Sequence, residues 1–195
     1  MSFSLYILSL GKRELIEVPE YTTFDIIDES DEYNGRCAGY EFMTMQEGQW
    51  FLICGKEPDV AAYTVCTIDV DKVEGGQVKY PSWVDNEYTI GDLFPLIIYD
   101  EVFDEFEHVL RYMLEQSPLN KIMFLARLQG TYEEIVCGTM QVDKFVSMLK
   151  DREILFNTCY IVSKESTIPD FVPSINDEFS PDDFRPWNGR FYYRD

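Results

Sequence analysis

The stretch DEVFDEFEHVLRYMLEQSPLNKIMFLARL, residues 100–128, contains both kinds of element from which this chain is built. Its first part, Asp100–Gln116, carries apolar residues at helical spacing: Val102, Phe103, Phe106, Val109, Leu110 and Met113. Acidic residues begin this part, where a helix dipole is positive, and Ser117-Pro118 ends it. Its last part, Lys121–Leu128, has the unbroken apolar character of a strand buried on both faces. The stretch predicts an amphipathic helix followed by a buried strand.

On the C-terminal side of residue 128, the pattern of an amphipathic helix followed by a buried strand repeats. A second helix is predicted from about Met140 to Lys150, with Thr139 as its N-cap and an apolar stripe of Val142, Phe145, Val146 and Leu149. Ile154–Val162 then reads as another buried strand. Strand, helix and strand are therefore expected to pack as layers.

Upstream, the chain reads as short strands separated by acidic turns. The expected strands are rich in β-branched and aromatic residues, and they are Phe3–Ser9, Thr23–Ile27, Tyr40–Met45, Trp50–Cys54 and Tyr63–Val70. The third and fourth are joined by a connection of hairpin length, so we expect them to pair. Near residue 90 the spacing of hydrophobic residues changes from every second residue, which is typical of strands, to a period of 3.6 residues, which is typical of helices. These patterns predict an α+β fold with a strand-rich N-terminal half that forms a mostly antiparallel sheet.

The C-terminal region differs from the rest of the chain in composition. We expect a single domain over residues 1–164 and an irregular arm over 165–195, because four prolines interrupt regular structure there and seven aromatic residues supply apolar surface. The arm is expected to cover its own domain, with Arg185, Arg190 and Arg194 paired to acidic groups. The alternative is that it binds a partner or a second copy of the chain, so the oligomeric state is left open.

Charge is the strongest indication of function. The chain carries 36 acidic against 16 basic residues, a formal net charge of −20. Such a surface repels nucleic acid and anionic membranes and attracts basic proteins. No positively charged export signal precedes the apolar N-terminal stretch, and no apolar run is long enough to span a bilayer. Five widely spaced cysteines favour free thiols in a reducing cytoplasm.

Catalytic and cofactor motifs are missing from the sequence. The single histidine, His108, is predicted on the outer face of the long helix, which disfavours serine or cysteine nucleophile chemistry. No phosphate-binding glycine loop is present, and a calcium loop started at Asp28 has Tyr33 and Gly39 where glycine and glutamate are needed. We therefore predict a protein without enzymatic activity, cofactor or metal, although acidic pairs are too numerous to judge without geometry.

Three segments resemble the immunity proteins of bacterial polymorphic toxin systems. They are Phe124–Gly130, Gly138–Leu149 and Ile154–Val162. The resemblance is one of character in a small, acidic α+β chain. It implies direct binding to one cognate toxin domain, which blocks the active site or the substrate surface of that domain.

A partner-binding surface is predicted from two acidic segments. It comprises Asp28, Glu29, Asp31 and Glu32 together with Trp83, Asp85 and Glu87. Acids would steer a basic partner, and an aromatic anchor would prolong the complex. Trp83 fits a loop side chain packed on the core equally well. Two other functions remain open: a self-associating structural protein, and an enzyme or binder for a cationic or metal-bound small ligand.

Overall fold

One seven-stranded sheet organises the computed structural model, which describes residues 3–11, 16–28, 48–56, 62–78, 93–128, 135–165 and 190–192. The strands lie in the order β2-β3-β1-β6-β8-β7-β9. They are β1 (Phe3–Leu10), β2 (Phe24–Asp28), β3 (Gly48–Gly55), β6 (Lys121–Leu128), β7 (Ile135–Gln141), β8 (Thr158–Ser163) and β9 (Arg190–Tyr192). Pairing is antiparallel from β2 to β8, whereas β7 runs parallel to both β8 and β9. The predicted α+β fold with a mostly antiparallel sheet is confirmed.

Smaller elements connect these strands. A second sheet pairs β4 (Cys66–Ile68) with β5 (Leu96–Ile98). The helices are η1 (Ala62–Thr64), α2 (Val70–Glu74), α3 (Asp100–Gln116) and α4 (Val142–Lys150). None of the helices in the described ranges combines the length and apolar composition that a membrane-spanning helix needs.

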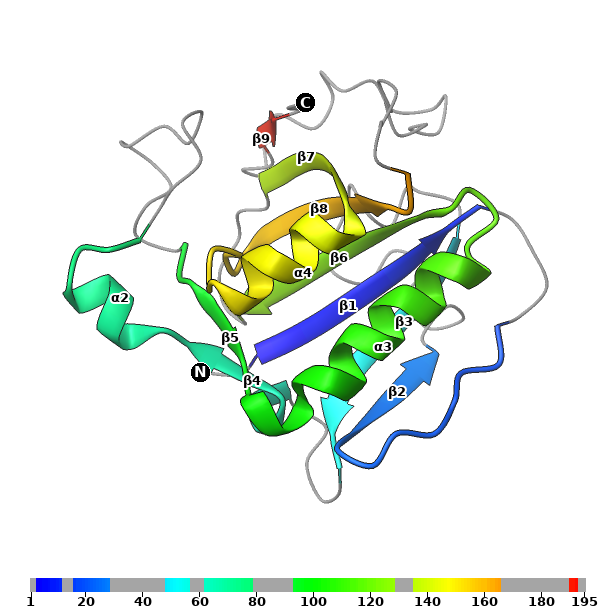
Figure 1. Cartoon of the computed structure of the whole chain (residues 1–195), viewed down its shortest axis with the longest axis horizontal. Helices are drawn as coiled ribbons and strands as arrows, with labels where there is room; N and C mark the ends of the chain where they lie inside the picture. Colours follow the sequence, from blue (N-terminus) through cyan, green and yellow to red (C-terminus); the bar gives the residue numbers. More distant parts are fainter. Residues whose placement is uncertain are drawn as a thin grey trace.

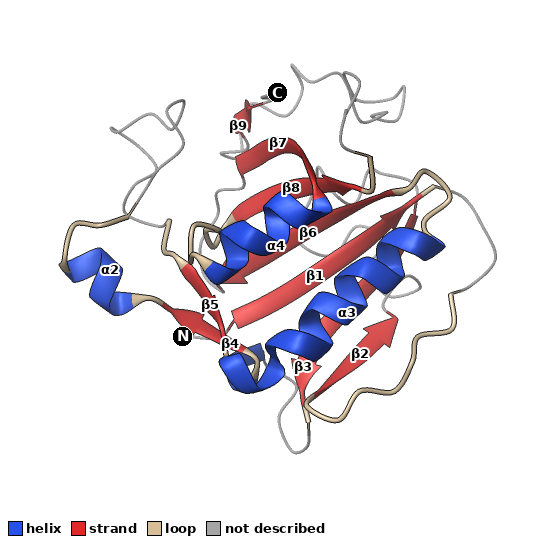
Figure 2. Cartoon of the chain, viewed as in Figure 1, coloured by secondary structure: helices blue, strands red, loops and turns tan. Residues whose placement is uncertain are grey.

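Helices α3 and α4 lie side by side on one face of the large sheet (Figures 1 and 2). Their apolar stripes meet that face through aromatic contacts centred on Phe124 of β6. Its ring centroid lies 6.0 Å from that of Phe106 in α3 and 5.2 Å from that of Phe145 in α4. Both rings approach Phe124 edge-on, the arrangement that aromatic pairs favour. The two helices are thereby fixed over one strand.

The opposite face of the sheet is also apolar and buried. Its core cluster consists of Tyr6, Leu8, Leu10, Trp50, Met123, Leu125, Cys159 and Ile161. Successive strand residues point to opposite faces, so β1, β6 and β8 need apolar residues at nearly every position. The predicted buried strand Lys121–Leu128 is confirmed as β6, and the predicted strand Ile154–Val162 is confirmed over the part that lies in β8.

Three of the sequence-based boundaries that differ from the structure do so for a clear local reason. In the predicted strand Tyr63–Val70 only β4 is extended. The first residues of that segment belong to η1, and at its end the Asp69 side chain accepts a hydrogen bond from the Lys72 amide at 3.0 Å and caps α2. Thr139 lies within β7, and the N-cap of α4 is Gln141, whose side chain accepts from the amides of Asp143 and Lys144.

The third difference concerns the last predicted strand. Regular pairing in β8 begins at Thr158 rather than at Ile154, because Asn157 has a φ of +61° and interrupts the extended backbone. The buried Asn157 side chain accepts a hydrogen bond from the Leu128 amide at 3.0 Å. It therefore sets the start of β8 against the end of β6.

The first strand of the expected hairpin, Tyr40–Met45, lies outside the described residues, so its pairing with β3 stays a prediction. Phe51, Leu52 and Ile53 are paired with β1 on one edge and with β2 on the other. The neighbours of β3 are therefore β1 and β2. In the predicted arm, Arg190–Tyr192 pairs with β7 of the same chain, whereas the rest of 166–195 lies outside the described residues, so its covering role stays a prediction.

Candidate functional site

Asp28 is the one predicted partner-binding residue inside the described ranges. It lies exposed at the end of β2, and its Oδ2 accepts a hydrogen bond from the Gln49 Nε2 at 2.6 Å. The other members of the predicted surface fall within 29–47 and 79–92, outside the described residues: Glu29, Asp31, Glu32, Trp83, Asp85 and Glu87. The assembly of that surface therefore stays a prediction.

Helix α3 presents acidic side chains of two kinds. Asp100, Glu101 and Asp104 are exposed, and their carboxylates make no hydrogen bond or ion pair with another residue in the described part of the chain. Glu105, by contrast, accepts hydrogen bonds from the amides and hydroxyls of Thr22 and Thr23. Those hydrogen bonds lower its pKa to about 2. Glu105 is thus used within the fold, whereas the acids at the start of α3 are available to a partner.

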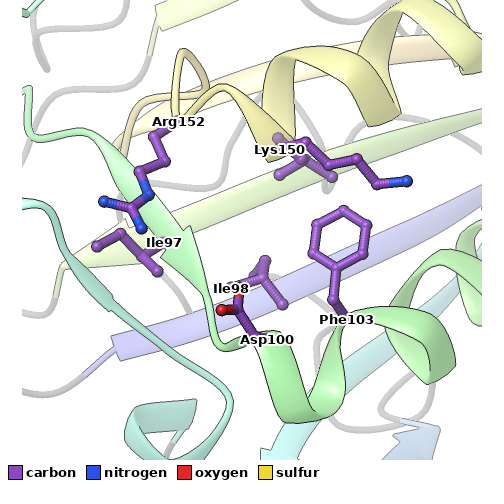
Figure 3. A pocket seen from close by; sticks show the side chains of 7 residues that line it. Ile97, Ile98, Asp100, Phe103, Lys150 and Arg152 are labelled. Carbon is purple, nitrogen blue, oxygen red and sulfur yellow. The ribbon is translucent and has the colours of Figure 1, made fainter.

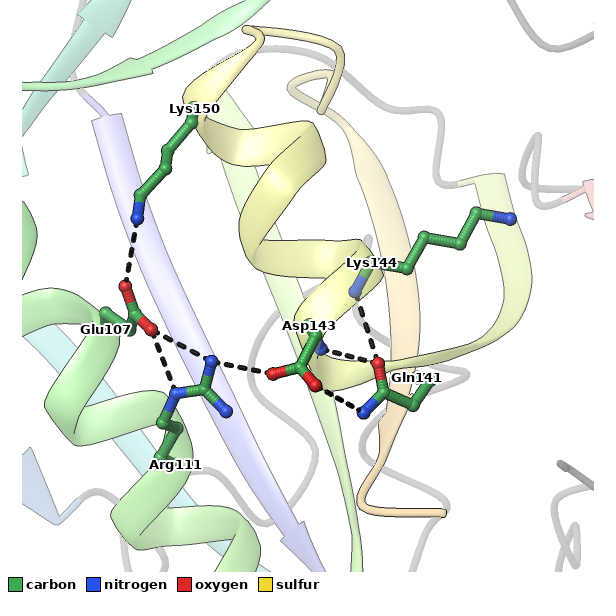
Figure 4. Close-up of polar contacts among 6 residues, drawn as sticks. All are labelled: Glu107, Arg111, Gln141, Asp143, Lys144 and Lys150. Atoms are coloured by element: carbon green, nitrogen blue, oxygen red, sulfur yellow. Dashed lines mark hydrogen bonds and ion pairs between the residues drawn. The ribbon is translucent and has the colours of Figure 1, made fainter. Parts of the chain in front are cut away.

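A network of ion pairs joins α3 to α4 (Figure 4). Arg111 contacts Glu107 at 2.9 Å and Asp143 at 2.8 Å, and the Lys150 ammonium lies 3.4 Å from Glu107. Burial alone would raise the pKa of Glu107, but the hydrogen bonds from Arg111 and Lys150 outweigh it and lower that pKa. The charges of both cations are therefore already balanced by acids of the same chain.

A pocket of about 310 Å³ opens where β5, the start of α3 and the end of α4 meet (Figure 3). Its apolar lining comes from Ile97 and Ile98 of β5, Phe103 of α3 and Leu149 of α4. Its charged groups are Asp100, Lys150 and Arg152. A volume of this size lies at the lower end of the range for small binding sites, and the lining combines apolar side chains with charged ones in similar shares.

Arg152 is fixed at the pocket rim by an unusual backbone and a buried partner. Its φ is +57°, the left-handed conformation that often ends a helix. Its guanidinium lies 3.3 Å from the Asp69 carboxylate, whose side chain is 2% exposed. Lys72 of α2 donates hydrogen bonds to the carbonyls of Asp151 and Arg152. The end of α4 and the start of α2 are thus attached to each other beside the pocket.

Among the described residues, His108 makes no hydrogen bond to a cysteine thiol. His108 is exposed, as predicted, and its hydrogen-bond partner in the described part of the chain is the Tyr21 hydroxyl, 3.3 Å from Nδ1. Cys54, Cys66 and Cys159 are buried free thiols, and burial raises the pKa of Cys66. A raised pKa keeps that thiol protonated and unreactive. Within the described ranges, no three His, Cys, Asp or Glu side chains are grouped to bind a metal ion.

Comparison of the chain with protein-family models, with curated proteins and with solved structures gives no match.

Sequence reasoning missed the pocket. Its lining residues come from 97–103 and 149–152, two segments brought together by the packing of α3 beside α4. The available signals were an acid directly after an apolar strand and two cations at the end of a helix. Such arrangements are common at helix ends, so neither signal distinguishes a pocket.

Proposed function

We propose that this chain is a non-enzymatic binding protein that recognises a basic protein, in the manner of an immunity protein bound to its cognate toxin domain. The main support is the net charge of −20 together with the way its cations are used. Within the described ranges, ion pairs with acids of the same chain are formed by Lys56, Arg111, Lys150, Arg152 and Lys164. The surplus of negative charge is therefore left to interact with partners.

Electrostatic steering favours a basic partner over a small metabolite. An acidic surface accelerates association with a basic protein, and salt screens the effect because the Debye length falls to about 3 Å at 1 M salt. Exposed Glu101 and Asp104 add to this field without competing contacts in the described part of the chain. Apolar groups at the centre of the interface would set the lifetime of the complex.

The test begins with affinity capture from the native host at low salt. A basic protein encoded beside this chain is expected among the captured proteins. With that protein purified, stopped-flow association should slow by about tenfold or more between 50 and 500 mM NaCl. An on-rate that does not change with salt would contradict the proposal.

Charge reversal then locates the surface. Reversal of Asp28 and Glu29 to lysine should slow association at low salt. The matched control reverses Asp71 and Glu74, two exposed acids of α2 outside the predicted surface. Equal slowing by both double variants would show that only total charge matters and would remove residues 28 and 29 from the interface.

A further inference from the structure

The charged groups around the pocket between β5, α3 and α4 differ in whether they already have a partner of opposite charge. The ammonium of Lys150 lies 3.4 Å from Glu107 and 5.1 Å from the centre of the Phe103 ring. The Arg152 guanidinium is paired with the buried Asp69 carboxylate. The Asp100 carboxylate has no hydrogen bond or ion pair in the described part of the chain. After these pairs are formed, the unbalanced charge at the pocket is negative.

Figure 3 shows how these groups are directed. The Lys150 ammonium extends away from Ile97 and Arg152, so its aliphatic stem rather than its charge borders the pocket. The Asp100 carboxylate lies beside Ile98. The pocket therefore combines an apolar wall with a carboxylate at its edge.

Such a wall and carboxylate match a long aliphatic stem that ends in a cation. Lysine and arginine side chains bury their methylene stems against apolar surface while the charged end stays near water or an acid. The volume of about 310 Å³ is sufficient for one such side chain. A small organic anion is the poorer match, because it would lie beside Asp100 while both cations already have acidic partners.

We propose that this pocket receives a lysine or arginine side chain of a basic partner protein. The stem packs on Ile97, Ile98 and Phe103, and the cation pairs with Asp100. The inference rests on the proposed function, since it names the part of the acidic surface that gives specificity rather than steering. A single anchored side chain in a pocket is a common source of such specificity.

The test uses a simple probe, N-acetyl-lysine N-methylamide, and needs no partner protein. The probe is titrated into protein labelled at isoleucine δ1 methyl groups, and the NMR shifts of Ile97 and Ile98 are followed. We expect saturable shifts with a dissociation constant on the order of millimolar. Asp100→Asn should weaken probe binding about three- to fivefold, the range of an exposed ion pair. Butyrate, which has an apolar stem and the opposite charge, should not saturate these signals.

Two variants serve as controls for this test. Glu101→Gln removes the same charge from the neighbouring residue of α3, which does not line the pocket, and should leave the probe affinity within about twofold. Ile97→Trp fills the pocket and should abolish the shift at Ile98 while the remaining spectrum stays folded. Saturation by butyrate, no saturation by the lysine probe, or equal weakening by Asp100→Asn and Glu101→Gln would each overturn the inference. Salt-dependent capture of a basic protein without probe binding would overturn the pocket alone, leaving the proposed function intact.

Discussion

At the scale of single residues, protonation of Glu105 makes the free energy of unfolding depend on pH in the acidic range. Thr22 and Thr23 hold its pKa at about 2, below the ordinary 4.5. Because the pKa is depressed in the folded state, the stabilisation is complete above pH 4.5 and is lost as pH falls toward 2. Glu105→Gln is expected to reduce the free energy of unfolding at pH 7 by about 1 kcal/mol, a modest value because the site is partly exposed. Urea denaturation at pH 7 and pH 3 should show that the difference in the free energy of unfolding between the wild type and Glu105→Gln is smaller at pH 3. Glu101→Gln on the same helix is the control, and an equal loss at both pH values for Glu105→Gln would contradict the linkage.

At the scale of elements, α2 depends on its contacts with the end of α4. A helix of five residues is too short to be stable alone. It is held by Lys72, which donates to two carbonyls after α4, and by Asp69, which caps α2 and pairs with Arg152. Lys72→Met should speed amide hydrogen exchange across residues 70–75 about tenfold while changing global stability by less than about 1 kcal/mol. Lys144→Met removes an ammonium from α4 that has no ion pair in the described part of the chain, so it should leave this exchange unchanged. Unchanged exchange in Lys72→Met would show that α2 does not depend on that contact.

At the scale of the whole molecule, the features that the sequence predicts correctly are those whose determinants lie within one short segment of the chain. Helix α3 matches its predicted bounds Asp100–Gln116, because its apolar spacing, acidic start and Ser117-Pro118 stop all lie within the segment. The order of strands does not follow from local pattern, since it places β1 between β3 and β6. The pocket was missed for the same reason: Asp100 and Arg152 line one pocket only after α3 and α4 have packed on one face. Only Asp28 of the predicted surface lies in a described segment, at a position already bonded to Gln49.

The net charge of −20 has a consequence for the whole fold as well as for binding. Self-repulsion among unbalanced carboxylates destabilises the compact state, and salt screens it. Salt also weakens ion pairs such as Arg111 with Asp143, but exposed pairs contribute only about 0–1 kcal/mol each. We therefore expect 0.5 M NaCl to raise the free energy of unfolding by an amount on the order of 1 kcal/mol, a small part of the stability typical of a domain. Urea unfolding at 20 and 500 mM NaCl measures the change. Matching experiments with sodium sulfate separate screening from general salting-out. A lower urea midpoint at high salt would mean that the ion pairs between α3 and α4 outweigh the repulsion. With the expected result, the same salt strengthens the fold and weakens partner binding, because both effects arise from one surplus of negative charge.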